Sequence, residues 1–395
     1  MDRARTRGQA AALRAIEAMV RGPAPHAVLL VGPEGVGKTT LALDLAAGLL
    51  CTAEPAARPC RACRACRMVE KGGHPDLHRL GPAGPGRQVV IGGPDARYRG
   101  VRELIGELVL MPVEGGARVA IVEAADRMNE DAQSALLKTL EEPPAGVVIV
   151  LCADQEDRLM PTVRSRCARV RLGLVGPRDI EAIVADHDLA DPPLAARLGR
   201  LAGGRPGIAL AYARAPDAVL IRAELSRVLL DLTDARPSGR LAAIRSAIPR
   251  ALALSAAMSA GETPPRARAG RKGAGAAAPM TGAEEGEDGL ADDGAESKGR
   301  PVPATERRRA AEILLGLWMD VARDLTLAGS GGGRSVRDTV LLEELAAVAS
   351  ELPAGSAARF LDRAARSAEL LASNVSPELL LDALALAWPR RPTAA

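Results

Sequence analysis

Residues 32–39 read Gly32-Pro33-Glu34-Gly35-Val36-Gly37-Lys38-Thr39, and Thr40 follows directly. The spacing G-x-x-x-x-G-K-[ST] is that of a loop that cradles phosphates. Its three glycines would let the backbone fold into a nest whose N–H groups point inward at a polyphosphate. Lys38 would place a point charge on the β and γ oxygens, and Thr39 would offer its hydroxyl to Mg²⁺. We take Gly32, Gly35, Gly37, Lys38, Thr39 and Thr40 as a candidate nucleotide site.

The flanking sequence supports this interpretation. Residues 26–31 predict a short buried strand, and residues 40–47 predict the helix whose N-terminus faces the phosphates. The chain has only five lysines among its 52 basic residues, so a lysine at position 38 departs from its general preference for arginine. The competing interpretation is a glycine-rich turn between strand and helix that binds nothing.

Composition limits the class of protein. The 395 residues are enough for two or three domains, and a hydrophobic content of 47% supports real cores. A net charge of +3 argues against a chain that binds nucleic acid through its own field, although a surface shared in an assembly stays open. The N-terminus lacks the apolar run of a secretion signal, and no stretch approaches the length of a membrane span. We therefore expect a cytoplasmic protein without membrane contacts, whose six cysteines are reduced or bound to metal.

Four of the six cysteines lie within sixteen residues, as Cys51-x8-Cys60-x2-Cys63-x2-Cys66. Such a set can close a tetrahedron of thiolates around Zn²⁺, and metal binding would supply the folding free energy of a module too small to fold alone. Three alternatives are a disulfide, which a reducing compartment disfavours, a thioredoxin-like redox site, which lacks its fold context, and scattered free thiols, which would not cluster so tightly. Since four thiolates fill a structural site, we expect the nearby His74 and His78 to be core or surface histidines.

The first half of the chain alternates strands and helices. Helices are expected at 6–20, 101–110 and 129–140, strands at 118–122, 147–152 and 168–172, and a loop at 81–93 with a possible strand at 88–91. This order predicts a parallel sheet covered by helices on both faces.

After Gly176 only helices are expected. They fall at 177–187, 192–201, 205–214, within 218–258, and at 306–327, 336–352, 357–373 and 377–388. Residues 262–303 are low in complexity and should be disordered. We therefore predict a nucleotide-binding domain at 1–173, a helical lid and the start of a helical region at 174–258, a linker or insertion at 259–305, and a helical collar at 306–395.

Three further stretches are specific. They are Ser134-Ala135-Leu136-Leu137-Lys138-Thr139-Leu140-Glu141-Glu142-Pro143-Pro144, Pro161-Thr162-Val163-Arg164-Ser165-Arg166-Cys167 and Asn374-Val375-Ser376-Pro377-Glu378-Leu379. With the phosphate loop and the cysteine module they resemble the bacterial clamp-loader subunits of DNA polymerase III, a group that contains the tau/gamma motor and the delta-prime stator. Recognisable motifs run from His26 to Cys167, and the rest of the chain resembles the group in its helical architecture and at Asn374–Leu379.

The resemblance implies an AAA+ fold: a P-loop α/β domain, a small helical lid, and a helical collar that assembles a hetero-pentamer with tau/gamma and delta subunits. That pentamer opens the sliding clamp and places it on primed DNA. Arg166 matches the family's arginine finger, which would reach the γ-phosphate of ATP on a neighbouring subunit. The bland alternative is a surface arginine beside a helix start. Arg205 could sit at the lid's nucleotide-sensing position, although Pro206 departs from the helical continuation expected there.

The residues after the strand at 118–122 indicate whether the chain resembles the motor or the stator subunits. Motor subunits carry Asp-Glu there, whereas this chain has Glu123 at the Mg²⁺-ligand position and Ala124, which cannot accept a proton, at the water-activating position. Asp126 is expected to point elsewhere. The end of the next strand, Leu151-Cys152-Ala153, offers no hydroxyl. Loss of a general base typically removes about 10²–10⁴ of rate, so the chain should bind nucleotide and hydrolyse it poorly.

Two hypotheses from different classes follow. The first is a delta-prime-like assembly subunit that supplies Arg166 in trans, and the second is a tau/gamma-like ATPase. Ala124 favours the first, as does the short end after the collar. A third, more remote hypothesis is an independent zinc-dependent DNA-binding protein. The small net charge and the shortage of aromatic residues for base stacking count against it.

Overall fold

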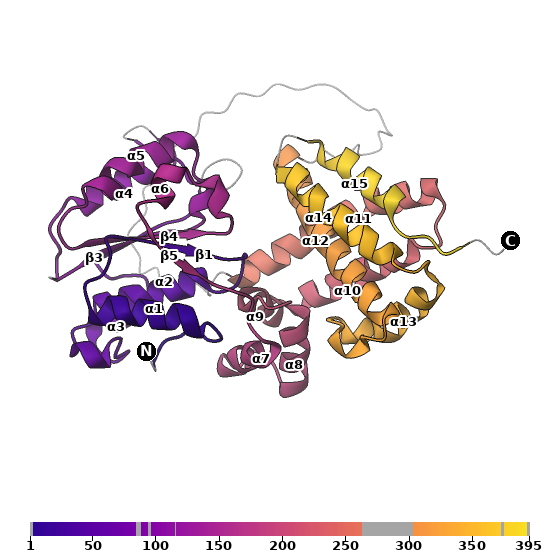
Figure 1. Cartoon of the computed structure of the whole chain (residues 1–395), viewed down its shortest axis with the longest axis horizontal. Coiled ribbons are helices and arrows are strands. Elements are labelled where there is room, and N and C mark those ends of the chain that lie inside the picture. The colour runs from indigo at the N-terminus through magenta and orange to yellow at the C-terminus, as the bar shows by residue number, and fades with distance from the viewer. Residues whose placement is uncertain are drawn as a thin grey trace, which may run out of the picture. The chain divides into compact units, whose positions relative to one another are not determined.

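The computed structural model describes residues 3–83, 88–93, 96–114, 116–262, 303–372 and 375–392. The chain divides into two compact units, each of which is described by itself (Figure 1). One is formed by Met1–Pro216 with Asp324–Ser350, and the other by Asp217–Arg323 with Glu351–Ala395. The functional domain boundaries expected from the sequence stay predictions. The greater part of the predicted linker at 259–305, residues 263–302, lies outside the described residues, as does Asn374.

The first unit is built on a five-stranded parallel sheet. Its strands are β1 (Ala27–Val31), β2 (Leu77–Leu80), β3 (Arg118–Val122), β4 (Val147–Ala153) and β5 (Ala168–Arg171), in the order β2-β3-β4-β1-β5. The three central strands are near-continuous apolar runs because both of their faces are covered. The predicted α/β class is confirmed.

One predicted strand is wrong. Residues 88–91 contribute only an isolated bridge between Val89 and Met128, and the sheet instead ends at β2. The sequence pattern does not predict β2, because its four residues, Leu-His-Arg-Leu, are few and half of them are polar, as suits an edge strand.

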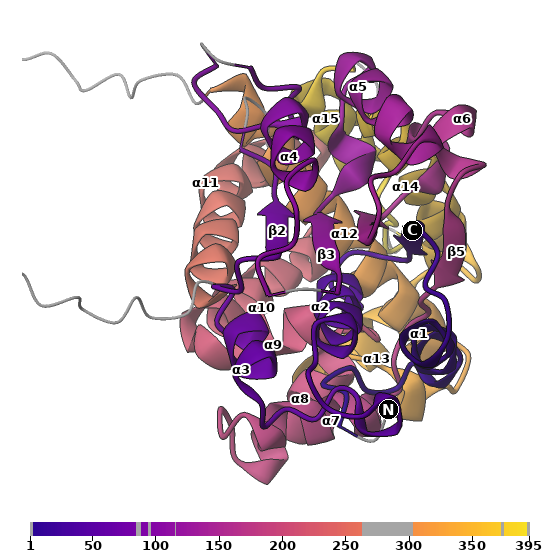
Figure 2. The same ribbon diagram turned by 90° about the vertical axis from the view of Figure 1, so that its left-hand side faces the viewer.

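Helices cover both faces of the sheet, as Figures 1 and 2 show. One face carries α1 (Ala10–Arg21), α2 (Lys38–Leu49) and α3 (Arg64–Glu70), and the other carries α4 (Val101–Leu108), α5 (Glu130–Glu141) and α6 (Pro161–Arg164). The period of two in β1 explains the two cores. Val28 and Leu30 pack with Leu41 and Leu45 of α2, whereas Leu29 points to the side of α4 and α5.

Three short helices complete the N-terminal part of this unit. They are α7 (Pro177–Asp186), α8 (Pro192–Leu201) and α9 (Pro206–Arg214), close to their predicted bounds. Each begins with a proline at its first turn, where the missing N–H costs no hydrogen bond. The predicted helix at 336–352 starts later, because 336–338 are irregular and 339–341 form a single short 3₁₀ turn before α13 (Leu342–Glu351).

The second unit is helical, as predicted. It contains α10 (Pro216–Asp231), α11 (Pro237–Glu262), α14 (Ser356–Ala372), α15 (Pro377–Ala387) and most of α12 (Ala304–Gly329). Trp318, Phe360 and Trp388 form its aromatic core, with ring centroids 4.6–6.4 Å apart. The buried Arg240 donates hydrogen bonds to the carbonyls of Ala385, Trp388 and Pro389 and thereby satisfies the C-terminal end of α15.

The expectation that no stretch approaches the length of a membrane span is wrong. Within α11, Pro237–Ser259 are long and apolar enough to cross a membrane by length and composition alone. A core helix passes the same test, and α11 packs on α15 with Ile244, Ala251 and Leu254 buried. With 28% of this stretch buried, packing covers one side of α11 and leaves the rest of it at least partly exposed.

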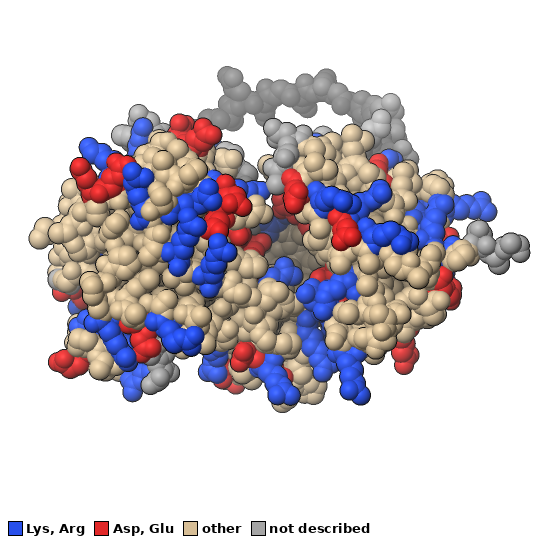
Figure 3. Space-filling view, in the orientation of Figure 1, with Lys and Arg blue, Asp and Glu red and all other residues tan. Residues whose placement is uncertain are grey.

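The face drawn in Figure 3 carries basic and acidic side chains next to one another, which agrees with the small net charge.

Candidate functional site

The phosphate loop connects β1 to α2. Gly35 and Gly37 have φ of 80° and 102°, in the left-handed region that glycine adopts without strain. A different constraint acts at Gly32, where a β-carbon would lie 2.4 Å from the carbonyl oxygen of Leu172. Thr39 and Thr40 stand half-buried in the first turn of α2. The loop therefore has the backbone that its sequence predicted.

Lys38 is the first residue of α2, and its ammonium donates hydrogen bonds to three protein acceptors. Its Nζ lies 2.8 Å from the carbonyl oxygen of Gly32, 2.9 Å from that of Pro33 and 2.5 Å from Oδ1 of Asp154. The side chain of Lys38 is 9% exposed and that of Asp154 is 26% exposed. The ammonium is thus held at the loop by two carbonyls and one carboxylate.

Asp154 is a residue of this site that the sequence pattern did not predict. The expected strand ended at Cys152, but β4 continues to Ala153, so the first side chain beyond its carboxyl end is a carboxylate. The N–H of Asp154 donates to Oδ1 of Asp126 at 3.2 Å. Asp126 was expected to point away from this site. It instead accepts a hydrogen bond from Asp154, the partner of Lys38. A polar residue after an apolar strand that neighbours β1 was the signal that could have revealed Asp154.

Two carboxylates at this edge have different environments. Burial raises the pKa of Asp126, and the nearby charge of Asp154 raises it further. Glu123, which follows β3, instead pairs with Arg79 of β2, whose Nε and Nη2 lie 2.9 and 2.5 Å from its Oε1. Ala124 has φ of 52° and offers no proton acceptor.

Cys152 is buried in the core behind this site. It is 1% exposed and packs in the core with Leu30 and Val150, on the α1 and α2 side of the sheet. Burial raises the pKa of its thiol to about 12.

The start of α9 rests on the phosphate loop. The N–H of Gly207 donates to the carbonyl oxygen of Gly35 at 2.8 Å, and a β-carbon on Gly35 would lie 3.4 Å from Cβ of Arg205. Pro206 does not disrupt this region, because it occupies the first turn of α9 and Arg205 precedes the helix. The Nε of Arg205 donates to Ala202 at 3.3 Å, so this residue lies beside the loop with its guanidinium bonded to its own turn.

Arg166 lies on a different part of the unit, in the turn after α6. Its Nη2 is 2.6 Å from Oε1 of Glu141, at the end of α5, and its Nη1 donates to the carbonyl of Thr162 at 2.9 Å. The side chains of Arg166 and Glu141 are 34% and 49% exposed. These partners belong to α5 and α6, and none of the phosphate-loop contacts above involves Arg166.

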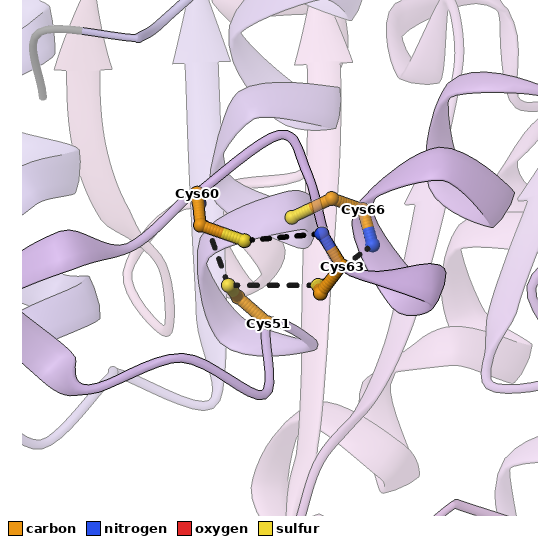
Figure 4. Close-up of side chains that lie close together, drawn as sticks. All are labelled: Cys51, Cys60, Cys63 and Cys66. Carbon is orange, nitrogen blue, oxygen red and sulfur yellow. Dashed lines mark hydrogen bonds between the residues drawn. The ribbon is translucent and has the colours of Figure 1, made fainter.

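The four clustered cysteines come together as predicted (Figure 4). Their sulfurs all lie within 4.8 Å of one another, and Sγ of Cys51 and Cys63 are 3.9 Å apart. A tetrahedron with Zn–S bonds of about 2.3 Å has edges of about 3.8 Å. The six cysteines of the chain are free thiols, so the disulfide alternative finds no support. The cluster could hold a metal, and its all-sulfur donor set suits Zn²⁺ or a similarly soft ion.

Backbone groups prepare this cluster for a metal. The N–H groups of Cys60, Cys63 and Cys66 donate to Sγ of Cys51, Cys60 and Cys63 at 3.3–3.4 Å. Burial opposes ionisation of Cys63, but hydrogen bonds from the backbone of Cys66 and Thr52 outweigh it and lower the pKa to about 6. Burial raises the pKa of Cys66. Metal binding would have to displace that proton.

The cysteine module is tied to the helix that begins with Lys38. Arg61, between two of the cysteines, pairs with the fully buried Asp44 of α2. Asp44 also accepts from the N–H of Thr6 at 2.9 Å and from its hydroxyl at 2.7 Å. His74 and His78 stand apart from this cluster: His74 is buried, and His78 contacts Glu107 at 2.7 Å.

The N-terminal part of the chain is similar to known proteins. A family model described as DNA polymerase III, delta subunit, matches residues 8–175. The chain is 39% identical over 183 residues to DNA polymerase III subunit delta' of Pseudomonas aeruginosa, covering 46% of this chain and 53% of that protein. It is 35% identical over 173 residues to subunit delta' of Bacillus subtilis, with 44% and 49% covered.

Subunit gamma/tau of Mycobacterium bovis is 33% identical over 171 residues, with 42% of this chain and 28% of that protein covered. Among solved structures, a gamma subunit-related protein of Thermotoga maritima matches with a TM-score of 0.41 and 16% identity, covering 95% of this chain and 99% of the other.

These matches span about half the length of the delta' relatives. Residues 8–175 are thus similar to the delta' relatives, and their five-stranded parallel sheet with a phosphate loop after β1 agrees with the α/β P-loop fold that the resemblance implied. The helices beyond residue 175 lie outside the family match.

Proposed function

We propose that this chain is a delta-prime-like subunit of the bacterial DNA polymerase III clamp loader, which supplies Arg166 in trans and hydrolyses ATP poorly itself. The observation that carries the proposal is a contrast within one domain. Arg166 of the S-R-C motif is a partly exposed guanidinium, whereas Ala124 leaves the chain's own site without a base. The relatives named delta' supply the family context.

Arg166 suits transition-state stabilisation in a neighbour. A guanidinium is planar and permanently charged, and it can approach two phosphate oxygens at once. Its present partner, Glu141, is about half exposed, so the pair costs little to separate. In the assembly, the γ-phosphate of ATP bound to a motor subunit would replace that carboxylate.

The chain's own site should bind nucleotide. The N–H groups of the phosphate loop and Lys38 would hold the phosphates, and Thr39 and Glu123 would reach Mg²⁺. Arg205, beside Gly35, would approach the phosphates from the lid. With Ala124 in place of a base, hydrolysis should be slow by about 10²–10⁴.

The metal would be structural Zn²⁺, held by Cys51, Cys60, Cys63 and Cys66. When bound it supplies folding free energy to a short module. Arg61, which pairs with Asp44, would carry that order to α2.

The proposed partners are tau/gamma and delta subunits in a hetero-pentamer, the sliding clamp, and primed DNA reached through the assembled complex. The site of action would be the cytoplasm, without membrane contacts. The helices within 174–258 would continue from the lid, and those of 306–395 would form the collar.

A tau/gamma-like motor is the second candidate, because the phosphate loop is complete and a gamma/tau relative is 33% identical. Steady-state ATP hydrolysis by the isolated chain separates the two, since a motor turns over and a stator does not.

The proposal is tested by reconstitution. The chain is mixed with tau/gamma and delta subunits, sliding clamp and primed DNA, and loading of labelled clamp is measured with and without it. We expect loading only when this chain is present. A chain that neither co-purifies with the other subunits nor supports loading would contradict the proposal.

A further inference from the structure

We propose that Asp154 lowers the affinity of this chain for nucleotide, because it competes with phosphate for the Lys38 ammonium. The inference rests on the nucleotide site proposed above and concerns its regulation. It follows from the contacts of Lys38, from the charges around Asp154 and from the burial of both groups.

The donor count is the first argument. A lysine ammonium has three N–H donors and no acceptor. Lys38 lies within hydrogen-bond distance of three acceptors: the carbonyls of Gly32 and Pro33, and Oδ1 of Asp154. Its hydrogen-bonding capacity is therefore filled by the protein. To reach the β or γ oxygen of a nucleotide, Lys38 must release one of these acceptors.

Asp154 is the partner that matters most for that exchange. The two carbonyls belong to the phosphate loop itself, whereas Asp154 comes from the end of β4 and brings a full negative charge. Glu123, the other carboxylate expected at this edge, is held by Arg79. Among the described residues, Asp154 is thus the acidic partner of Lys38.

The surroundings strengthen the competition. Lys38 is nearly buried and Asp154 is about three-quarters buried, so water screens their attraction weakly. The carboxyl group of Asp126 accepts the N–H of Asp154 and adds a second acidic group behind it. A triphosphate entering the loop would meet this negative edge and would find Lys38 already neutralised.

Population arithmetic gives the size of the effect. The apparent dissociation constant rises by the inverse of the fraction of molecules whose site is competent. If the Lys38–Asp154 pair is formed in about nine molecules of ten, removing it should tighten binding about tenfold.

The experiment measures binding of Mg·ATP to the full-length, zinc-loaded chain by calorimetry. The variants are Asp154→Asn, which keeps the shape and removes the charge, and Asp131→Asn, an exposed control at the start of α5. We expect Asp154→Asn to tighten binding about tenfold and Asp131→Asn to change nothing. In the double variant Lys38→Met/Asp154→Asn, the gain should vanish.

A second measurement does not depend on nucleotide. Thermal unfolding of wild type, Lys38→Met, Asp154→Asn and the double variant forms a cycle that reports the coupling of the two side chains. We expect the double variant to lose less stability than the sum of the losses of the two single variants. Absence of coupling would overturn the proposal.

Three binding outcomes would also overturn it. Equal affinity of wild type and Asp154→Asn would refute the competition and leave the nucleotide site standing. Weaker binding by Asp154→Asn would mean that Asp154 helps to hold Mg·ATP. If neither protein binds Mg·ATP although the cycle shows coupling, the nucleotide site itself is wrong, and this proposal fails with it.

Discussion

Lys38 and Arg166 are the two cations on which the proposed function depends, and each is paired with a carboxylate of the same unit. Lys38 is 9% exposed and bonded to three acceptors, one of them Asp154. Arg166 is 34% exposed and pairs with Glu141, which is 49% exposed. One cation is enclosed at the carboxyl edge of the sheet, and the other is open to solvent beyond α6.

Burial decides how readily each cation changes partner. An exposed ion pair contributes about 0.2–1 kcal/mol to stability, so a neighbour's phosphate could displace Glu141 at little cost. Removing one partner of a fully buried pair costs about 3–5 kcal/mol, because the other charge is left without a partner. The Lys38 pair lies nearer that limit. The contrast suits a subunit that offers a catalytic group to its neighbour and keeps its own site restrained.

The largest effect is expected from removal of Arg166, the more exposed of the two cations. In the assembled loader, Arg166→Ala should reduce clamp- and DNA-stimulated ATP hydrolysis, because a finger arginine contributes about 10³–10⁵ where it dominates the barrier. Several motor sites would dilute the change in the bulk rate. Nucleotide affinity of the isolated chain should not change. Phosphate release by the reconstituted loader measures the first effect and calorimetry the second.

Lys38→Ala is the matched variant. It should abolish nucleotide binding by this chain and barely affect turnover by the loader. The inverse result, with Lys38→Ala halting hydrolysis and Arg166→Ala silent, would make this chain the motor.

A second test restores the missing base. Ala124→Glu should raise single-turnover hydrolysis by the isolated chain, by at most about 10²–10⁴. The left-handed backbone at this position already carries a β-carbon, so glutamate adds little further strain.

Ala124→Gln, of equal size and without a base, is the control for this test. An equal rise with glutamine would show that proton abstraction is not the cause. A flat rate with glutamate would direct attention to the Lys38–Asp154 pair rather than to the buried Cys152.

Loss of zinc should loosen the region of Lys38 and leave the region of Arg166 unchanged. Purified protein should contain about one zinc per chain, and Cys63→Ser should lower that content. Because Arg61 pairs with Asp44 of α2, hydrogen exchange should quicken in 51–66 and in α2, but not in the turn that carries Arg166.

Cys167→Ser is the matched control, since Cys167 lies outside the cluster. A metal-free wild type of unchanged stability would refute the zinc assignment.

The smallest effect concerns the surface pair. Glu141→Gln should change the free energy of unfolding by less than about 1 kcal/mol and alter hydrolysis by the loader less than about fivefold. Denaturant titration and phosphate release measure the two quantities. A loss as large as that of Arg166→Ala would show that Glu141 positions the arginine in the assembly.

The sequence predicted local features well. The phosphate loop, the cysteine cluster, the buried strands and most helix bounds follow from spacing and periodicity within a few neighbouring residues. The edge strand β2 was not predicted, because four residues with two polar side chains carry little periodic signal. Asp154 was not predicted as the partner of Lys38, because it lies 116 residues away along the chain.

By itself, the sequence determined which chemical groups the chain possesses: a complete phosphate loop, four clustered thiols, an arginine in S-R-C, and no base at position 124. The tertiary structure alone decided what each group touches. The strand order β2-β3-β4-β1-β5 sets β4 beside β1 and so brings Asp154 to Lys38, while a turn between cysteines brings Arg61 to Asp44. Spacing along a chain fixes local geometry, whereas such charge pairs form only when packing removes distant segments from water together.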